Sequence, residues 1–496
     1  MNSHRHFLSI ALVALLAPSI PAFGQSETTV HTKQYDTGGV YEGEFLDGKQ
    51  HGEGKYTLPN GYEYDGEWID GRIEGAGTAT FPNGSVYTGE FRNGRPEGTG
   101  KIIFSDGGTY EGQWVDGTIT GEGVAIYANG VKYEGTFKNA VHDGTGVMEA
   151  PSGYRYEGAW VDGNKEGRGK ITYPDGAIYE GDVTNGVREG AGTLTMPDGL
   201  IYTGAWGAGQ INGTGVLTQP NGDRYEGSFA NGRRDGQGTA FYASGDVYEG
   251  AFSGDKRDGF GVFTGADGYV FEGEWTQGRI EGTGKVSYPD GSVYEGAFVN
   301  DLQHGSGTIT YADGSTYEGE WNNGVIEGKG IAKYDNGLVY EGDFLNAKNH
   351  GQGTMTYGDG YRYSGAWKDG LRHGDGQATY ADGTIYVGDF VDGQREGQGK
   401  ITMPDGFVYD GSWISGEIDG SGTATYPNGD IYEGQFSDGQ RQGRGLMRYA
   451  TGEEYDGFWA NGRQASEAEA TTPVEPPVTN ESVIPEDNDT TGASDG

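Results

Sequence analysis

The side chains best able to do chemistry in this chain are carboxylates, and they recur at a fixed place in a repeated motif. The sequence has 74 Asp and Glu against 34 Lys and Arg, a formal net charge of −40. Fifteen of nineteen aromatic-x-Gly motifs place Glu or Asp directly after the aromatic residue, as at Glu42, Asp65, Glu111 and Glu134. Rows of carboxylates suit divalent cations. The alternative, which we favour, is a solvated acidic face whose charges are screened by salt.

No catalytic machinery is visible among the other reactive residue types. The chain has no cysteine, and three of its eight histidines lie within the first 31 residues. The Gly-x-Ser-x-Gly and His-Glu-x-x-His motifs are absent. Acidic pairs recur with the repeat, so they do not mark one place as an active site. We therefore predict a protein that is not an enzyme, with no cofactor, no metal site and no catalytic residue.

Gly-x-Gly pairs such as Gly52 and Gly54, or Gly282 and Gly284, resemble phosphate-binding loops only superficially. They lack the following helix and the lysine that such loops require. The acidic charge also opposes contact with nucleic acid, whose phosphates attract clustered Lys and Arg. We predict no nucleotide and no nucleic-acid partner.

These residues belong to a 23-residue unit that is repeated nineteen times without insertion or deletion. The aromatic residue of each unit is Tyr41, Tyr64, Tyr87 and so on to Tyr455, with Phe271 as the one replacement. An unbroken period of this length indicates an array in which each unit packs on its neighbours. Such an array offers a long surface rather than a pocket.

One unit, residues 64–86, has the pattern of a β-hairpin. Aromatic and glycine residues alternate with polar ones, the two-residue period of a strand. Asp70 and Gly71 predict a two-residue turn with positive φ, and 82–84 (Pro-Asn-Gly) predicts a three-residue loop. We expect three pairs across the hairpin: Trp68 with Ile73, Gly66 with Gly75, and Tyr64 with Gly77.

The odd repeat length makes the loop lengths matter. Strict alternation over 23 residues would move each successive tyrosine to the opposite face, and one two-residue turn plus one three-residue loop restores the phase. Tyr64 and Tyr87 then share a face, and Gly75 lies beside Phe91. We expect the glycines to lie where rings from adjacent strands cross, because a Cβ there would collide with the rings.

The same register predicts like-charged pairs on the polar face, Glu67 with Glu74 and Glu274 with Glu281. Like charges directly opposite each other are unfavourable, which is the specific reason to consider bridging cations.

The chain resembles MORN repeats, whose pattern is Tyr-x-Gly-x-aromatic, then Gly, then Gly-x-Gly. The family's frequent His before Gly-x-Gly remains only at His51, His304, His350 and His373, and most other copies carry Glu or Asp. The resemblance implies an all-β fold, an elongated single-layer antiparallel sheet of about nineteen stacked hairpins. It also implies a scaffold that often dimerises, and the family has been linked to phospholipid binding. Some members add a lipid kinase or lysine methyltransferase domain, for which the flanks here are too short.

The repeats come in two kinds that mostly alternate. The residue four positions after each tyrosine is Trp in one kind and Phe, or in one case Val183, in the other. Six of eight complete Trp repeats have Ile two residues before Gly-x-Gly, and five have Ala two residues after it, as at Ala79. Phe repeats prefer larger residues at the second place, such as Ile102 and Met148. This exchange of volume indicates a 46-residue packing unit, although tandem duplication alone could also have copied the positions together.

We expect four segments: a signal peptide at 1–24, a short linker at 25–37, the repeats at 38–462, and an acidic, Pro- and Thr-rich disordered tail at 463–496. The signal has Arg5 before a short apolar run and small residues before Gln25, with cleavage after Ala22 as the alternative. Its ten to twelve apolar residues are too few to cross a bilayer, which needs roughly 20. We predict export to a periplasm, cell envelope or extracellular space.

The aromatic face of a single-layer sheet would be too large to leave in water, so the sheet must curl on itself, pair with a second copy or receive a partner. We therefore predict a partner-binding surface on it, made of Tyr64, Trp68, Tyr110, Trp114, Trp160, Trp206, Trp275, Trp321, Trp367 and Trp413. The leading hypothesis is a non-catalytic scaffold for protein–protein contact, with a protein partner or a homodimer. The alternatives are attachment to membrane lipid through the aromatic face, and carbohydrate binding on the aromatic rows.

Overall fold

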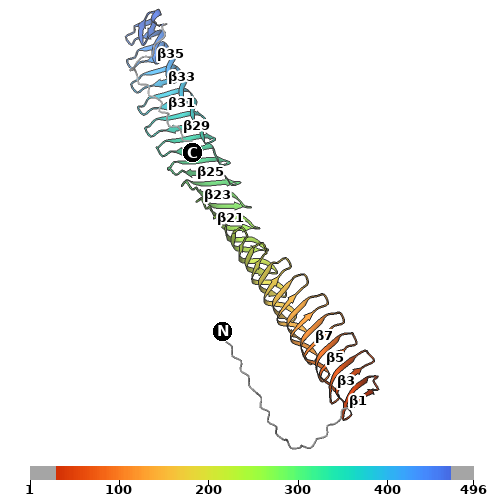
Figure 1. Cartoon of the computed structure of the whole chain (residues 1–496). Helices are drawn as coiled ribbons and strands as arrows, with labels where there is room; N and C mark the ends of the chain where they lie inside the picture. Colours follow the sequence, from red (N-terminus) through yellow and green to blue (C-terminus); the bar gives the residue numbers. More distant parts are fainter. Residues whose placement is uncertain (1–28, 471–496) are drawn as a thin grey trace, which may run out of the picture. The chain divides into compact units, whose positions relative to one another are not determined.

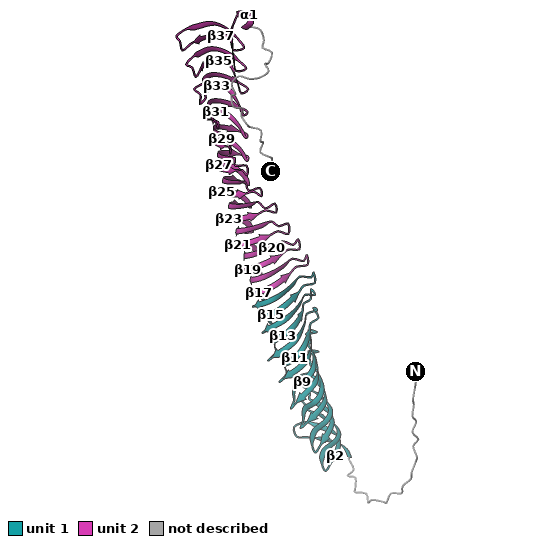
Figure 2. Ribbon diagram, turned by 90° about the vertical axis from the view of Figure 1, so that its left-hand side faces the viewer, with its two compact units in different colours: residues 1–213 teal, residues 214–496 magenta. Residues whose placement is uncertain are grey.

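The computed structural model of the chain describes residues 29–470, which form 39 strands and one short helix. The expected signal peptide at 1–24 and residues 471–496 of the expected tail lie outside these residues. The chain divides into two compact units, Met1–Gly213 and Thr214–Gly496, coloured teal and magenta in Figure 2.

Unit 1 contains the first sixteen strands and the start of the next one. Their bounds are β1 Thr29–Gln34, β2 Val40–Leu46, β3 Lys49–Thr57, β4 Glu63–Ile69, β5 Arg72–Thr80, β6 Val86–Arg92, β7 Arg95–Ile103, β8 Thr109–Val115, β9 Thr118–Ile126, β10 Lys132–Lys138, β11 Val141–Glu149, β12 Arg155–Val161, β13 Asn164–Thr172, β14 Ile178–Thr184, β15 Val187–Thr195, β16 Ile201–Gly207 and β17 Gln210–Thr218.

Unit 2 contains the remaining elements. Their bounds are β18 Arg224–Ala230, β19 Arg233–Phe241, β20 Val247–Ser253, β21 Lys256–Thr264, β22 Val270–Thr276, β23 Arg279–Ser287, β24 Val293–Val299, β25 Leu302–Thr310, β26 Thr316–Asn322, β27 Val325–Lys333, β28 Val339–Leu345, β29 Lys348–Thr356, β30 Arg362–Lys368, β31 Leu371–Thr379, β32 Ile385–Val391, β33 Gln394–Thr402, β34 Val408–Ile414, β35 Glu417–Thr425, β36 Ile431–Ser437, β37 Gln440–Arg448, β38 Glu454–Ala460, β39 Arg463–Ala465 and α1 Glu467–Ala470.

Within each unit, every strand pairs antiparallel with the strands before and after it in the chain. This holds from β1 to β16 in unit 1 and from β18 to β39 in unit 2. Figure 1 shows the hairpins following one another in chain order. The expected all-β, antiparallel fold of stacked hairpins is confirmed.

Both predicted connections are present in the hairpin of β4 and β5. Asp70 and Gly71 have φ of 52° and 83°, so they form the expected two-residue turn. After β5, the N–H of Gly84 donates to the carbonyl of Phe81, and the N–H of Phe81 donates to the carbonyl of Ser85, each at 2.8 Å. These bonds close the expected three-residue loop. Tyr64 and Tyr87 are both fully buried, as the phase argument predicted.

The predicted register is right at the turn and wrong beyond it. Trp68 lies opposite Ile73, but Gly66 lies opposite Gly77 and Tyr64 opposite Ala79. A β-bulge between Gly66 and Trp68 causes the shift, because the partner strand carries two more residues there. Glu67 and Glu74 are therefore not a directly opposed pair, and the same bulge separates Glu274 from Glu281.

The glycines have more than one steric cause. A Cβ on Gly77 would lie 2.6 Å from Cε2 of the Tyr64 ring, as expected. Gly66 faces the Gly77 backbone, and a Cβ there would lie 2.5 Å from the Gly77 Cα. Gly75 pairs with Phe91 as predicted. Its φ of +73° and the Glu67 side chain, which occupies the space of a Cβ, explain the glycine instead of a ring.

The ends of the described chain are more regular than the sequence suggested. Strand β1 lies in the segment 25–37 that was expected to be a linker, and it pairs along its length with β2. Strand β39 and helix α1 lie in the expected tail. Gln442 donates from Nε2 to the carbonyl of Ala470 at 2.9 Å, which holds α1 against β37. Within 29–470, no helix is long and apolar enough to cross a membrane.

Candidate interaction surfaces

The ten aromatic residues predicted to bind a partner form the core of the repeats. Tyr64, Trp68, Tyr110, Trp114, Trp160, Trp206, Trp275, Trp321, Trp367 and Trp413 have exposed fractions between 0% and 7%. Within each unit the structure brings them into a layer with the intervening Phe residues and leaves almost none of their surface in contact with solvent.

Edge-to-face contacts build this aromatic layer. The Tyr64 ring lies 5.6 Å from Trp68 in its own repeat and 5.0 Å from Phe91 in the next. The Tyr64 hydroxyl donates to the carbonyl of Glu67 at 3.1 Å, and Trp68 Nε1 donates to the carbonyl of Gly54 at 3.1 Å. Burial raises the pKa of Tyr87 to about 12. The polar atoms of the rings are thus bonded inside the array and are not available to a ligand.

Side chains from the two ends of the hairpin cover the rings, in keeping with the alternative that the sheet curls on itself. Gln303, next to a two-residue turn, donates to the hydroxyl of Tyr288 in a three-residue loop at 2.6 Å. Lys165 donates to the hydroxyl of Tyr154 at 2.8 Å. Because turn and loop side chains meet over the aromatic layer, a single-layer sheet can bury its apolar face without a partner.

The position two residues before Gly-x-Gly also differs between the two kinds of repeat. Where a Phe or Val repeat carries arginine there, the guanidinium lies over a ring of the following repeat. Arg188 lies 4.2 Å from the Trp206 ring, and Arg441 lies 4.4 Å from the Trp459 ring. Arg188 also donates to the carbonyl of Gly209 in the next turn at 2.6 Å. These cation–π contacts tie successive repeats together.

The carboxylates before Gly-x-Gly connect successive repeats by hydrogen bonds. Glu97 Oε2 accepts the backbone N–H of Asp116 in the next turn at 2.8 Å, and Glu396 accepts that of Ser415 at 2.7 Å. His350 places Nδ1 at 3.4 Å from the equivalent N–H of Asp369. The frequent replacement of His by Glu or Asp therefore keeps an acceptor at this position. No group of three or more potential metal ligands occurs in 29–470.

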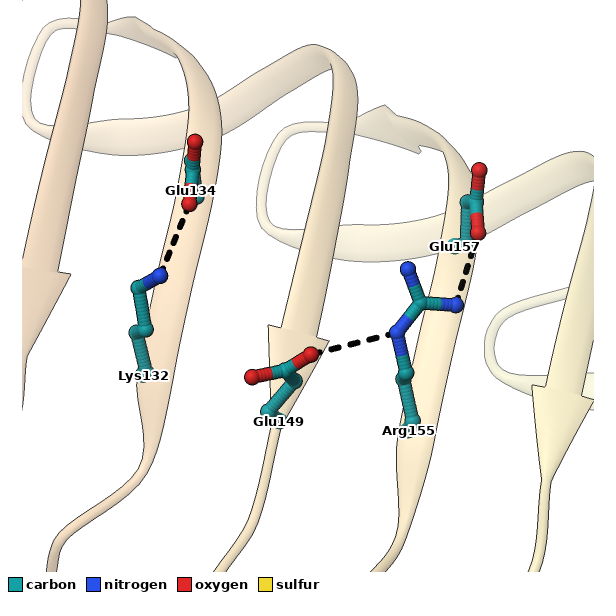
Figure 3. Close-up of polar contacts among 5 residues, drawn as sticks. All are labelled: Lys132, Glu134, Glu149, Arg155 and Glu157. Atoms are coloured by element: carbon teal, nitrogen blue, oxygen red, sulfur yellow. Dashed lines mark hydrogen bonds and ion pairs between the residues drawn. The ribbon is translucent and has the colours of Figure 1, made fainter.

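The outer face of the hairpins carries exposed polar pairs. In Figure 3, Arg155 bridges Glu149 at 3.2 Å and Glu157 at 2.7 Å, and Lys132 contacts Glu134 at 2.8 Å. These residues come from β10, β11 and β12, and their side chains are 36–60% exposed. The outer face thus carries solvated ion pairs, but the net charge of −40 shows that carboxylates outnumber the cations, and Glu53 lies directly opposite Glu67.

A regular set of apolar side chains is exposed beside the two-residue turns. Each member precedes or follows a turn and is 36–53% exposed. This turn-edge row consists of Ile69, Val115, Val141, Val161 and Val187 in unit 1, and Val299, Leu302, Val325, Leu345, Leu371, Val391 and Ile414 in unit 2. The sequence reasoning missed this row. The sequence did contain a sign of it, because apolar residues next to the turns stand at positions of the strand alternation that are otherwise polar.

The model of the MORN repeat matches the chain in eighteen segments: 41–61, 64–86, 87–109, 110–132, 133–153, 156–178, 179–201, 202–224, 225–247, 248–268, 271–293, 294–316, 317–339, 340–360, 363–385, 386–408, 409–431 and 432–454. The nineteenth unit, from Tyr455, is not matched, and its second strand, β39, has 3 residues. A search of curated proteins found no match.

Several solved structures share a distant likeness. The TCP domain of SAS-4 from Drosophila melanogaster, in complex with a proline-rich motif of Ana2, is 16% identical and covers 36% of this chain and 90% of that chain, with a TM-score of 0.23. The TCP10 domain of Danio rerio CPAP with a STIL peptide is 16% identical over 54% and 93%, with a TM-score of 0.16. Streptogramin B lyase is 12% identical over 60% and 91%, with a TM-score of 0.11. TM-scores this low carry no argument about this chain.

Proposed function

Because this chain belongs to the MORN-repeat family, we propose that it is an exported, non-catalytic scaffold whose repeats bind a protein partner or a second copy of the chain. Members of the family commonly serve as repeat scaffolds that contact proteins or membranes. The compartment is a periplasm, a cell envelope or the extracellular space. The recurring residues described above serve packing and inter-repeat bonding, which supports a scaffold rather than a catalyst.

The observation that carries the binding role is the turn-edge row. Within each unit its apolar side chains recur at intervals of 23 or 46 residues, next to the two-residue turns. A partner that contacts several repeats gains a small amount of apolar burial at each repeat that carries a member of the row, and these contributions add along the array. The sequence analysis predicted the aromatic rings as the partner-binding surface. Because those rings are buried, we propose the turn-edge row as the binding surface instead.

Lipid attachment and carbohydrate binding both depended on the aromatic layer. Its Tyr and Trp rings are buried and their polar atoms bonded within the repeats. The net charge of −40 also disfavours anionic lipid. We therefore prefer a protein partner, and treat binding to vesicles as an outcome that would contradict the proposal.

The test replaces two members of the row with acidic residues, Val115→Glu together with Val161→Glu. Other repeats tolerate Asn322 or Lys368 at this position, so folding should be kept. The matched control is Ala76→Glu with Thr99→Glu, two exposed outer-face sites away from the row where other repeats carry Glu. We expect the turn-edge variant, but not the control, to lose self-association in light scattering or a partner captured from the native envelope.

Equal behaviour of the two variants would overturn the role of the row, and flotation of the wild-type chain with zwitterionic vesicles would favour the lipid alternative. Export is tested separately by sequencing the N-terminus of the protein from its native cell. We expect the mature chain to begin at Gln25, or at Phe23 if cleavage follows Ala22. An intact Met1 in the cytoplasmic fraction would contradict export.

A further inference from the structure

The sheet ends differently in the two units. In unit 2, the last strand, β39, has 3 residues and pairs only with 458–460 of β38. The chain then leaves the sheet, and α1 packs against β37 and β38. In unit 1, β1 pairs with β2 along all of Thr29–Gln34 without a bulge, and among residues 29–470 it pairs with β2 alone. Short strands and covering helices blunt a sheet edge, so the edge at β1 is the open one.

The open edge of β1 presents the backbone groups of Val30, Thr32 and Gln34. Tyr35, which follows the strand, donates its N–H toward β2, to the carbonyl of Gly39 at 2.8 Å. Successive residues of a strand direct their backbone groups to opposite sides, so the odd-numbered residues of β1 face β2 and the even-numbered ones face away. All of β1 is exposed, and Val30 has an exposed fraction of 74%. Such a row is a template for pairing with another strand.

The sequence of β1 is complementary to itself when two copies run antiparallel. Thr32 then lies opposite Thr32 of the second copy, and Val30 lies opposite Gln34 of the second copy. These residues direct their backbone groups to the open edge, so each pair exchanges both of its N–H···O bonds. Facing threonines already occur between β5 and β6, where the Thr78 and Thr88 hydroxyls lie 3.1 Å apart. Pairs of this kind stabilise a sheet.

The inner face beside β1 is incomplete as well. Phe45 is partly exposed, whereas Phe91 and Phe137, at the same place in later repeats, are 4% and 5% exposed. A hollow of about 380 Å³ lies there, lined by Thr29, His31, Lys33, Phe45, Asp47 and Gly48. In the register above, Thr29 lies opposite Tyr35 of the second copy. A second copy therefore brings the loop that contains its own Tyr35 to the rim of this hollow.

The charge distribution favours contact at this strand. Two copies of a chain with a net charge of −40 repel each other over most of their surfaces. Strand β1 carries Lys33 and no carboxylate. Glu42 on β2 lies opposite Thr32, so the Glu42 residues of two paired copies are three strand spacings, or about 14 Å, apart. That separation exceeds the Debye length at physiological salt.

We propose that two copies of the chain pair through β1 as an antiparallel, isologous dimer, in which the sheet of unit 1 continues from one copy into the other. A twofold contact of this kind is closed, because it uses β1 of both copies, and β39 with α1 blunts the edge in unit 2. This inference narrows the proposed function. It gives a second copy its own surface at β1 and leaves the turn-edge row to a different protein, so each can fail without the other.

The experiment measures the mass of the full chain by sedimentation across a range of concentrations. Thr32→Pro removes an N–H that faces the open edge, and proline is tolerated on the solvent side of an edge strand. Thr32→Val is the matched control, because it keeps the N–H. We expect dimers for the wild-type chain and Thr32→Val, and a dissociation constant at least tenfold higher for Thr32→Pro. Hydrogen exchange at β2 should be the same in both variants, which shows that β1 still pairs with β2.

The turn-edge variant, Val115→Glu with Val161→Glu, separates this inference from the proposed function. It should dimerise as the wild-type chain does. If it is monomeric while Thr32→Pro remains a dimer, the self-association belongs to the row, and the role of β1 is overturned while the proposed function stands. A monomeric wild-type chain, or particles that grow beyond a dimer as the concentration rises, would also overturn the closed pairing at β1.

A crosslink tests the register directly, because the chain has no native cysteine. Facing residues of a hydrogen-bonded pair have Cα atoms about 5.5 Å apart, which suits a disulfide. Thr32→Cys should therefore give a covalent dimer on mild oxidation. Thr99→Cys, which is also exposed on the outer face, should remain monomeric under the same conditions. Equal yields of covalent dimer from the two variants would overturn the pairing of Thr32 with its copy.

Discussion

The inner and outer faces of one hairpin are built from the same two strands but respond to different physical limits. On the inner face, the ring of Tyr64 lies against Gly77, and Ala79 is fully buried between Tyr64 and Tyr87 on the neighbouring strands. On the outer face, Arg155 and its partners lie in solvent. Steric fit limits which residues the inner face accepts, and charge pairing limits those on the outer face. A substitution of similar size should therefore lower the free energy of unfolding much more on the inner face than on the outer face.

The largest expected effect comes from Gly77→Ala. The added Cβ would lie 2.6 Å from Cε2 and Cζ of the Tyr64 ring, which packs against Phe91 and cannot move without disturbing the next repeat. We expect a loss of about 3 kcal/mol or more. Hydrogen exchange read by mass spectrometry should show loss of protection centred on β4 and β5. The neighbouring Ala76→Gly, on the outer face, serves as the control, and equal effects of the two would remove the contrast between the faces.

A smaller effect is expected for Ala79→Ile, which adds volume between two tyrosines. Phe repeats accommodate Ile102 at this place, so the side chain itself is compatible with the fold. In a Trp repeat the larger indole of Trp68 leaves less room, and we expect a destabilisation of about 1–3 kcal/mol. Chemical denaturation measures it. The reverse change, Ile102→Ala, tests the same pairing by leaving a cavity, and an unchanged melting curve for Ala79→Ile would refute the volume exchange between repeats.

A pH-dependent effect is expected at His142, which covers the inner face. Its Nε2 lies 2.6 Å from the Tyr127 hydroxyl, its ring stacks on Tyr133, and burial lowers its pKa from 6.5 to about 4. Between these values the unfolded chain binds a proton that the folded chain excludes, so stability present above pH 6.5 is lost as the pH falls toward 4. His142→Gln should reduce this loss.

Gln is the natural choice for that variant because Gln50 and Gln303 occupy the same position and donate to tyrosine hydroxyls. The denaturant midpoints of the wild-type protein and the variant are compared across this pH window. The pH dependence of stability that the carboxylates contribute is the same in both proteins and therefore cancels in the comparison. The complementary change, Gln303→His, should add a similar acid sensitivity. Parallel pH profiles for wild-type and His142→Gln would show that His142 does not contribute.

The sequence was sufficient for the features that depend on local chemistry. The turn at Asp70 and Gly71 and the loop at 82–84 could be predicted because each requires particular residues at particular φ values. The β-bulge beside Glu67 could not, since it depends on how the backbone satisfies its bonds between repeats. The burial of Trp68 was misjudged for a related reason. The side chains that cover it come from a turn and a loop at opposite ends of a strand, and their meeting depends on strand curvature.

The smallest effect is expected on the outer face, for Arg155→Gln. The variant loses ion pairs to Glu149 and Glu157, but all three side chains are at least 36% exposed, and water replaces much of what is lost. We expect a change below about 1 kcal/mol, smaller still at high salt because exposed charges are screened. Chemical denaturation at low and high salt measures both numbers. A loss as large as that for Ala79→Ile would mean that charge pairing limits the hairpin as strongly as shape does.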